Sequence, residues 1–206
     1  MGRHVRRTHA RSGPTLQGVA RAAMRMDSDV VASLLAESLR DRGVVAVWED
    51  LAMPLLYGMG RKWEETQRYV EVEHLLSWCV SSALRRVAPA PAEPRARPVL
   101  LACRPRRTHS LPLEALAAAL RERGLPHRVP GPCTPVEAVV RALRRTAPRA
   151  VVLWSHVGDA DDVRALRATL RAAAGSAQST KVCTAGPGWR PHAHLASLSE
   201  AMRALG

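Results

Sequence analysis

Apolar residues in the first part of the chain recur at the spacing of an α-helix. Within residues 27–43, Asp27 or Ser28 is placed to cap a helix and Gly43 is placed to end it. The apolar residues between them fall on one stripe, at Val30, Val31, Leu34, Leu35 and Leu39. The pattern therefore predicts an amphipathic helix over this segment.

The same spacing predicts three further helices, over residues 16–26, 44–60 and 70–87. Pro54 should kink or break the second of these, because proline removes a backbone hydrogen bond and clashes with the preceding turn. Four amphipathic helices with short connections indicate an up-and-down bundle, which we place at residues 14–87. The proline-rich segment that follows, residues 88–98, is typical of an extended linker.

Beyond the linker, short β-rich runs alternate with segments of helical spacing. The runs predict β-strands at residues 99–103, 127–129, 150–154 and 181–185. The intervening segments predict helices at residues 112–123, 134–145, 160–173 and at the C-terminus. Continuous apolar strands separated by helices indicate a parallel sheet with helices on both faces. The predicted fold is thus an all-α bundle followed by an α/β domain of the flavodoxin or Rossmann type at residues 99–206.

Ligands of such sheets bind at the carboxyl ends of the strands. This rule selects three loops, at residues 104–111, 155–159 and 186–189. The first loop offers an imidazole at His109, and the second offers a hydroxyl at Ser155. The third contains Gly186 and Gly188, where the backbone can pass close to a bulky neighbour. An ordinary strand-to-helix turn would explain any one of these features equally well.

Aromatic residues make up only 3% of the chain, and there is no Phe, so each tryptophan calls for its own explanation. Trp63 is separated by nine residues from the pair Glu73–His74. We expect Trp63 to lie in a loop before a helix that begins near Tyr69, and to fold back over this pair. The competing interpretation is a core tryptophan that caps the bundle, with Glu73 as a charge on the helix face.

The formal net charge of +13 is a weak indication of nucleic acid binding, because the arginines recur at helical spacing between apolar residues, as on a solvated helix face. Residues 1–13 form a basic tail that we expect to be disordered, without the apolar segment of a secretory signal. No stretch approaches the roughly 18 apolar residues of a membrane span. We therefore expect a cytoplasmic protein without membrane contact.

Neither zinc binding nor independent catalysis is indicated. The four cysteines stand singly rather than in C-x-x-C pairs, which argues against a zinc site and against a disulfide framework. No nucleophile–base pair or pair of carboxylates is recognisable. We expect a protein that is not an enzyme.

The bundle and the three loops together resemble the cobalamin-binding domains, in which a helical cap precedes a flavodoxin-like domain. In that family a D-x-H-x-x-G loop supplies the lower axial histidine of cobalt, and an S-x-L loop and a G-G loop contact the nucleotide tail. The resemblance implies that His109 is the lower axial cobalt ligand. It also implies cobalamin contacts for the neighbouring motif positions, namely Thr108, Ser110, Ser155, His156, Val157, Ala185, Gly186 and Gly188.

The helical part is similar to one branch in particular, the CarH and LitR type of light-responsive regulators of the MerR family, whose caps carry W-x9-E-H. Trp63, Glu73 and His74 reproduce this spacing. The resemblance implies adenosylcobalamin as the cofactor, with the indole packed against the adenosyl group and Glu73 and His74 as polar contacts. It further implies a homo-oligomer, a role in transcription regulation and a response to light.

Three positions depart from the family pattern. Arg107 stands where the family has a carboxylate that orients the axial histidine, and Pro112 replaces a glycine. Glu64 stands where light-sensing relatives have a histidine. Residues 1–13 are also too few for a winged helix-turn-helix, so we expect contact with DNA only through a DNA-binding regulator as partner.

Two other functions stay open. A corrinoid carrier of a methyltransferase system has the same plan, but it depends on a well-oriented axial histidine and an open upper face. A corrinoid-free interaction module would keep only the scaffold.

Overall fold

The computed structural model describes residues 12–206 apart from 67, 92, 94, 104–108 and 190–192, with the backbone alone at 12–14, 63 and 64. Two compact units, Met1–Ala83 and Leu84–Gly206, divide the chain. Within the described residues, no helix is long and apolar enough to cross a membrane.

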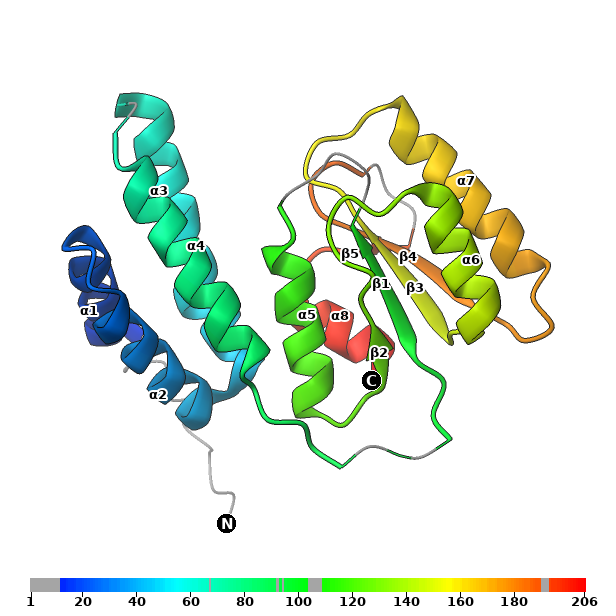
Figure 1. Ribbon diagram of the computed structural model, residues 1–206, viewed down its shortest axis with the longest axis horizontal. Helices are drawn as coiled ribbons and strands as arrows, with labels where there is room; N and C mark the ends of the chain where they lie inside the picture. Colours follow the sequence, from blue (N-terminus) through cyan, green and yellow to red (C-terminus); the bar gives the residue numbers. More distant parts are fainter. Residues whose placement is uncertain (1–11, 67, 92, 94, 104–108, 190–192) are drawn as a thin grey trace, which may run out of the picture. The chain divides into compact units, whose positions relative to one another are not determined.

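The first unit is helical. Asp27 caps the second helix, since its carboxylate accepts a hydrogen bond from the backbone N–H of Val30 at 3.1 Å. Gly43 interrupts this helix with φ 76° and ψ 169°, a conformation that favours glycine. Both predicted ends of that segment are therefore confirmed. The helices are α1 (Ser12–Met24), α2 (Ser28–Val47), α3 (Met53–Thr66) and α4 (Val70–Arg85), with a π-helical turn, η2 (Trp48–Ala52), before α3 (Figure 1).

Pro54 is accommodated by this π-helical turn rather than by a break. The N–H of Met53 donates to the carbonyl of Trp48, five residues back, so the turn just before the proline is wider than an α-helical turn. A wider turn relieves the clash that a proline ring makes with the carbonyl four residues earlier. The helix consequently runs on past Pro54.

The prediction that Trp63 lies in a loop is wrong, because α3 continues to Thr66 and includes it. The predicted helix ended at residue 60, whereas α3 runs on through Gly58 and Gly60. Neither adopts positive φ, and a Cβ at either position would meet nothing within 4 Å, so both are open helical positions. The next helix begins at Val70, directly after Tyr69, which has φ 71°.

The second unit is an α/β domain with a parallel sheet. The strands are β1 (Val99–Cys103), β2 (His127–Arg128), β3 (Ala150–Trp154), β4 (Lys181–Ala185) and β5 (His194–Leu195). They lie in the order β2-β1-β3-β4-β5, and every pairing is parallel. The two-residue strand β5 was not expected from the sequence.

Helices cover both faces of this sheet, as predicted. They are α5 (Leu111–Glu122), α6 (Val136–Thr146), α7 (Ala160–Ala174) and α8 (Leu198–Leu205). The helices α5 and α8 pack together on one face, and α6 and α7 pack together on the other (Figure 1). The predicted fold class, a helical N-terminal region followed by a Rossmann-like parallel sheet, is confirmed.

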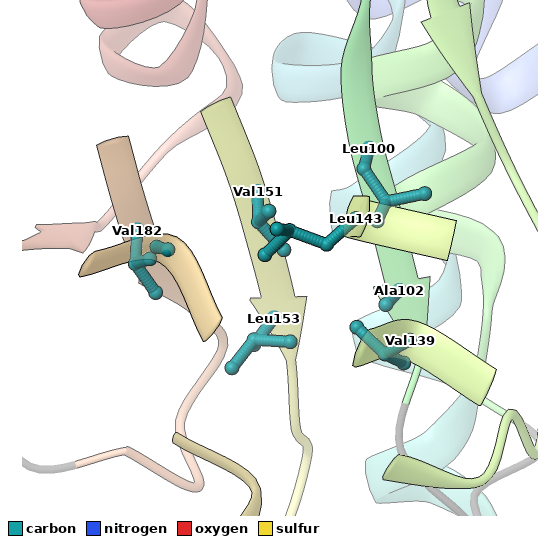
Figure 2. Packing of buried hydrophobic residues seen from close by; sticks show 8 residues of the cluster. Leu100, Ala102, Val139, Leu143, Val151, Leu153 and Val182 are labelled. Atoms are coloured by element: carbon teal, nitrogen blue, oxygen red, sulfur yellow. The ribbon is translucent and has the colours of Figure 1, made fainter. Parts of the chain in front are cut away.

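The core on the α6–α7 face consists of branched aliphatic side chains. Leu143 of α6 is fully buried and lies against Val151 of β3, with Leu100 of β1 close by (Figure 2). Because the chain has no Phe, the large side chains of this cluster are Leu and Val, with Ala102 and Ala173 among them and Trp189 packed against the cluster. The strand β1 is buried along its whole length and β3 at all residues but the last, Trp154, as expected for a sheet that is covered on both faces.

Leu143→Ala should destabilise the second unit by about 2–5 kcal/mol, because it removes buried methyl groups and leaves a cavity. Urea denaturation followed by circular dichroism measures this change. Val163→Ala, at a 48% exposed position of α7, is the matched control and should change stability by less than about 0.5 kcal/mol. Equal effects of the two substitutions would contradict this description of the core.

Acidification should destabilise the fold through His127. Burial lowers the pKa of His127, and the charges of Arg121 and Arg128 act in the same direction, against the hydrogen bond with the Leu125 carbonyl. The unfolded chain therefore binds a proton at His127 at a pH where the folded chain still holds the neutral form. The free energy of unfolding should therefore fall as the pH drops below about 6.5, the pKa of His127 in the unfolded chain, toward its lower pKa in the folded chain.

The pH dependence of urea denaturation tests this expectation. His127→Gln keeps a side-chain donor for the Leu125 carbonyl but cannot titrate, so its stability should fall less than that of the wild type between neutral and acidic pH. Parallel curves for the two proteins would show that His127 does not contribute.

Candidate functional site

The carboxyl ends of the three longest strands lie at one edge of the sheet. In the parallel register, Cys103 of β1 pairs with Trp154 of β3, and Trp154 pairs with Ala185 of β4. The three loops chosen from the sequence follow these residues directly. The register thus brings together loops that are about 30 to 80 residues apart in the chain.

His109 and His156 meet at this edge. Their ring centroids are 4.8 Å apart, and the ring planes are inclined by 23°, so the imidazoles are stacked. Both side chains are exposed. Thr108, Arg107 and the rest of 104–108 lie outside the described residues, so the first loop is described only from His109 onward. The stacking brings the candidate axial histidine into contact with the loop after β3.

Ser110 begins helix α5, just after His109. Its hydroxyl donates to Glu114 at 3.1 Å, and its carbonyl accepts the N–H of Glu114 at 3.0 Å. The other carboxylate oxygen of Glu114 accepts from Arg85 at 2.9 Å. Ser110 and Glu114 are therefore bonded to each other across the first turn of α5. Pro112 lies within this turn and does not break the helix, as expected for a proline at a helix start.

Ser155 is fully buried at the end of β3. Its hydroxyl lies 3.1 Å from the carbonyl of Val157 and 3.1 Å from a carboxylate oxygen of Asp162, both of which are acceptors. Asp162 also accepts the N–H of Asp159 at 2.9 Å, and Asp159 accepts the N–H of Asp162 in return. This capping box at the start of α7 fixes the turn that carries His156 and the exposed Val157.

Asp162 was missed in the sequence analysis. The spacing of Asp159 and Asp162 before an apolar helix resembles a capping box with an Asp in place of the usual Glu. That spacing could have located the start of α7. It could not have revealed the bond to Ser155, which depends on the turn between the strand and the helix.

The glycines of the third loop pack against the second loop. Gly186 has φ 95°, and a Cβ there would lie 2.3 Å from the Ser155 carbonyl oxygen and 2.9 Å from the Trp154 ring. A Cβ at Gly188 would lie 2.7 Å from the Ser155 hydroxyl oxygen. The N–H of Gly188 donates to Ser155 at 3.1 Å, and the N–H of Ser155 donates to Ala185 at 3.1 Å. The expected close approach is present, and the bulky neighbour is the loop after β3.

Glu73 and His74 lie in the first turn of α4, in the helical unit. The Nδ1 atom of His74 is 2.8 Å from the Val70 carbonyl and 3.2 Å from Glu73, and Ser77 donates to Glu73 at 2.7 Å. His74 is 74% exposed, so this polar group faces solvent in the isolated unit. The side chains of Trp63 and Glu64 lie outside the described residues. The two units are described separately, and so are their candidate residues.

A cobalamin fits the donor set at the sheet edge. Within the described part of the chain, no three His, Cys, Asp or Glu side chains gather closely enough to hold a metal ion by themselves. A corrin ring fills the equatorial positions of its own cobalt, so the protein needs to supply only one axial ligand. The exposed imidazole of His109, at the edge where such sheets bind ligands, is a group of this kind.

Comparisons with known proteins point the same way. Residues 15–87 match the family model of the B12 binding domain. The HTH-type transcriptional repressor CarH of Myxococcus xanthus is 30% identical over 132 residues, which cover 64% of this chain and 44% of the repressor. The chain thus spans less than half the length of this relative.

Two solved structures are similar. The monomethylamine corrinoid protein of Methanosarcina barkeri superposes with a TM-score of 0.68 at 12% identity, over 93% of this chain and 96% of that one. A cobalamin-binding protein from Desulfitobacterium hafniense gives a TM-score of 0.44 at 14% identity, over 92% and 96% of the two chains. At such low identity the first match establishes the fold alone. By its B12 binding domain and its identity to the repressor, the chain resembles the cobalamin-binding region of the CarH-type regulators.

Proposed function

We propose that this chain is a non-catalytic, cobalamin-binding sensor that acts on transcription through a partner protein. The observation that carries the proposal is the match to the B12 binding domain, together with 30% identity to a transcriptional repressor over 64% of the chain. The proposal divides the chain into a basic tail at residues 1–13, a cap at 14–87, a linker at 88–98 and a flavodoxin-like domain at 99–206. Direct DNA contact is not part of it.

In the flavodoxin-like domain, we assign the lower face of the corrin to the carboxyl edge of the sheet. His109 is the proposed axial ligand of cobalt, and its ring is already exposed there. The proposed contacts to the rest of the cofactor come from the same three loops: Thr108, Ser110, Ser155, His156, Val157, Ala185, Gly186 and Gly188. Ser155, Gly186 and Gly188 also hold the second and third loops against each other.

In the cap, we assign the upper face to Trp63, Glu73 and His74. Glu73 and His74 are within 3.2 Å of each other, so they act as one polar group toward a sugar or a base. The indole of Trp63 would supply the flat apolar surface against which an adenosyl group packs. We therefore propose adenosylcobalamin as the cofactor. When bound, it supplies a cobalt–carbon bond that light can break.

A sensor of this kind requires two conformers that differ in affinity for the cofactor, because equal affinity would shift nothing. We propose that loss of the adenosyl group changes the assembly of a homo-oligomer, or its contact with a DNA-binding regulator. The competing function is a corrinoid carrier, since the monomethylamine corrinoid protein shares the fold of this chain. A carrier needs an upper face that is open to a methyl donor, which an indole at Trp63 would cover.

Retention of adenosylcobalamin by the purified chain in the dark is the first expected result. Absorbance after desalting measures it. Trp63→Ala should weaken binding by about tenfold, equivalent to about 1.4 kcal/mol, because the adenosyl group loses its packing surface. His109→Ala should have a smaller effect. Trp78→Ala is the matched control, since Trp78 is 75% exposed on the neighbouring helix α4.

A different outcome would favour one of the alternatives. Retention of methylcobalamin that is indifferent to Trp63→Ala would indicate the carrier. If neither cobalamin is retained, the chain is a corrinoid-free interaction module and the proposed function is wrong.

Green light should change the assembly state of the adenosylcobalamin-loaded chain. Size-exclusion chromatography in the dark and after illumination measures the elution volume, and absorbance spectra confirm that the cobalt–carbon bond has broken. A sample that is loaded identically and kept in the dark is the control. Complete photolysis without a shift in elution volume would contradict assembly as the light output.

A further inference from the structure

We propose that His156 is a positioning residue that orients the axial histidine, His109, by ring stacking. This inference rests on the proposed function, because it concerns the lower face of the same cobalamin site. It assigns to the loop after β3 a role that the family pattern gives to a carboxylate two residues before the histidine. In this chain that position is Arg107, whose side chain has no acceptor.

The geometry of the two imidazoles carries the inference. Centroids 4.8 Å apart and planes inclined by 23° are within the range of favourable offset stacking of aromatic rings. Stacking uses the ring faces and leaves the ring edges, where the nitrogen atoms lie, available for other contacts. His109 can therefore be held in one plane by His156 and still present a nitrogen to a metal.

The loop that carries His156 is fixed on both sides. The residue before it, Ser155, is fully buried, and its hydroxyl reaches the Val157 carbonyl and Asp162 at 3.1 Å. Asp162 is 2% exposed and belongs to the capping box of α7. The backbone of Ser155 is bonded to Ala185 and Gly188 of the third loop. His156 thus projects from a turn with little freedom to move, which is what an orienting group requires.

The backbone of His109 is held by the helix that follows it, α5. It directly precedes Ser110, whose carbonyl and hydroxyl both bond to Glu114 in the first turn of α5. The main chain is therefore anchored on the C-terminal side of His109, while the side chain is exposed and would otherwise rotate. A ring that is already oriented loses less rotamer freedom when it binds a ligand, which favours binding.

Electron paramagnetic resonance of bound cob(II)alamin tests this inference. The full chain is produced with histidine labelled with nitrogen-15 and loaded with unlabelled cob(II)alamin. An axial protein histidine then splits each cobalt line into a doublet, whereas the cofactor's own base, with nitrogen-14, gives a triplet. The wild type should show the doublet. His109→Ala should show the triplet, or no axial nitrogen.

Two substitutions at His156 test whether a stacked ring at this position keeps His109 bound to cobalt. His156→Ala removes the stacking surface and should convert more than half of the doublet signal to a triplet or to an unsplit signal. His156→Phe keeps a flat ring without nitrogen atoms and should retain the doublet. His127→Gln, at the amino end of the sheet, is the matched control and should leave the spectrum unchanged.

The outcomes distinguish the inference from the function on which it rests. A chain that retains the corrin and shows a full doublet in His156→Ala overturns the role of His156, and the cobalamin-binding function stands. A wild-type triplet with retained corrin also overturns it, because His109 is then not the ligand. A wild type that retains no corrin overturns both. A doublet that is lost in both His156→Ala and His156→Phe would overturn stacking as the mechanism.

Discussion

The parallel register of β1, β3 and β4 is the constraint on which the candidate site depends. Because Cys103, Trp154 and Ala185 are paired across the sheet, the three following loops start from one edge. Both faces of the sheet are covered, so a shift of one strand by a single residue would move each of its side chains to the opposite face and disrupt the packing on both sides. The packing of the core thus helps to position the three loops. The loops add a second level of order, since the backbone of Ser155 joins the loop after β3 to the loop after β4.

The close packing of the loops after β3 and β4 gives Gly186 and Gly188 a structural role. In the family pattern, glycine allows the backbone to approach the cofactor. Here Gly186 and Gly188 first allow an approach to Ser155, and any Cβ at these positions would collide with it. The two explanations are compatible, because the same glycines can allow both approaches. Substitution at either glycine would nonetheless disturb the fold of the edge before it disturbed a ligand.

Much of the fold follows from periodicity, and the exceptions have identifiable causes. The strands β1 and β3 are continuous apolar runs of five residues, and β4 is a run of the same length that also contains Lys181 and Thr184, so the positions of all three could be read directly. The strand β5 has only two residues, too few to establish a period. The extension of α3 to Thr66 was missed because the predicted helix ended at residue 60, whereas Gly58 and Gly60 occupy ordinary helical positions.

The candidate site could be predicted in part. His109, Ser155 and Gly186 could be located, because the rule for strand ends depends on the order of elements alone. The stack between His109 and His156 could not, because ring contacts depend on loop geometry that leaves no spacing in the sequence. The bond from Ser155 to Asp162 was hidden for the same reason.

The proposed orientation of His109 by His156 would have a consequence for the strength of an axial bond. A carboxylate that accepts a hydrogen bond from the far ring nitrogen fixes the imidazole and also raises its basicity, so it strengthens the bond to the metal. A stacked ring fixes the plane and transfers no such charge. A histidine oriented by stacking on His156 would therefore be a well-placed but weaker ligand than one that donates to a carboxylate. A methyl carrier also depends on a well-oriented axial histidine, so the contact between the two histidines does not separate the sensor from the carrier. The proposed difference between the two functions therefore lies in the cap, where an indole at Trp63 would cover the face that a carrier must leave open.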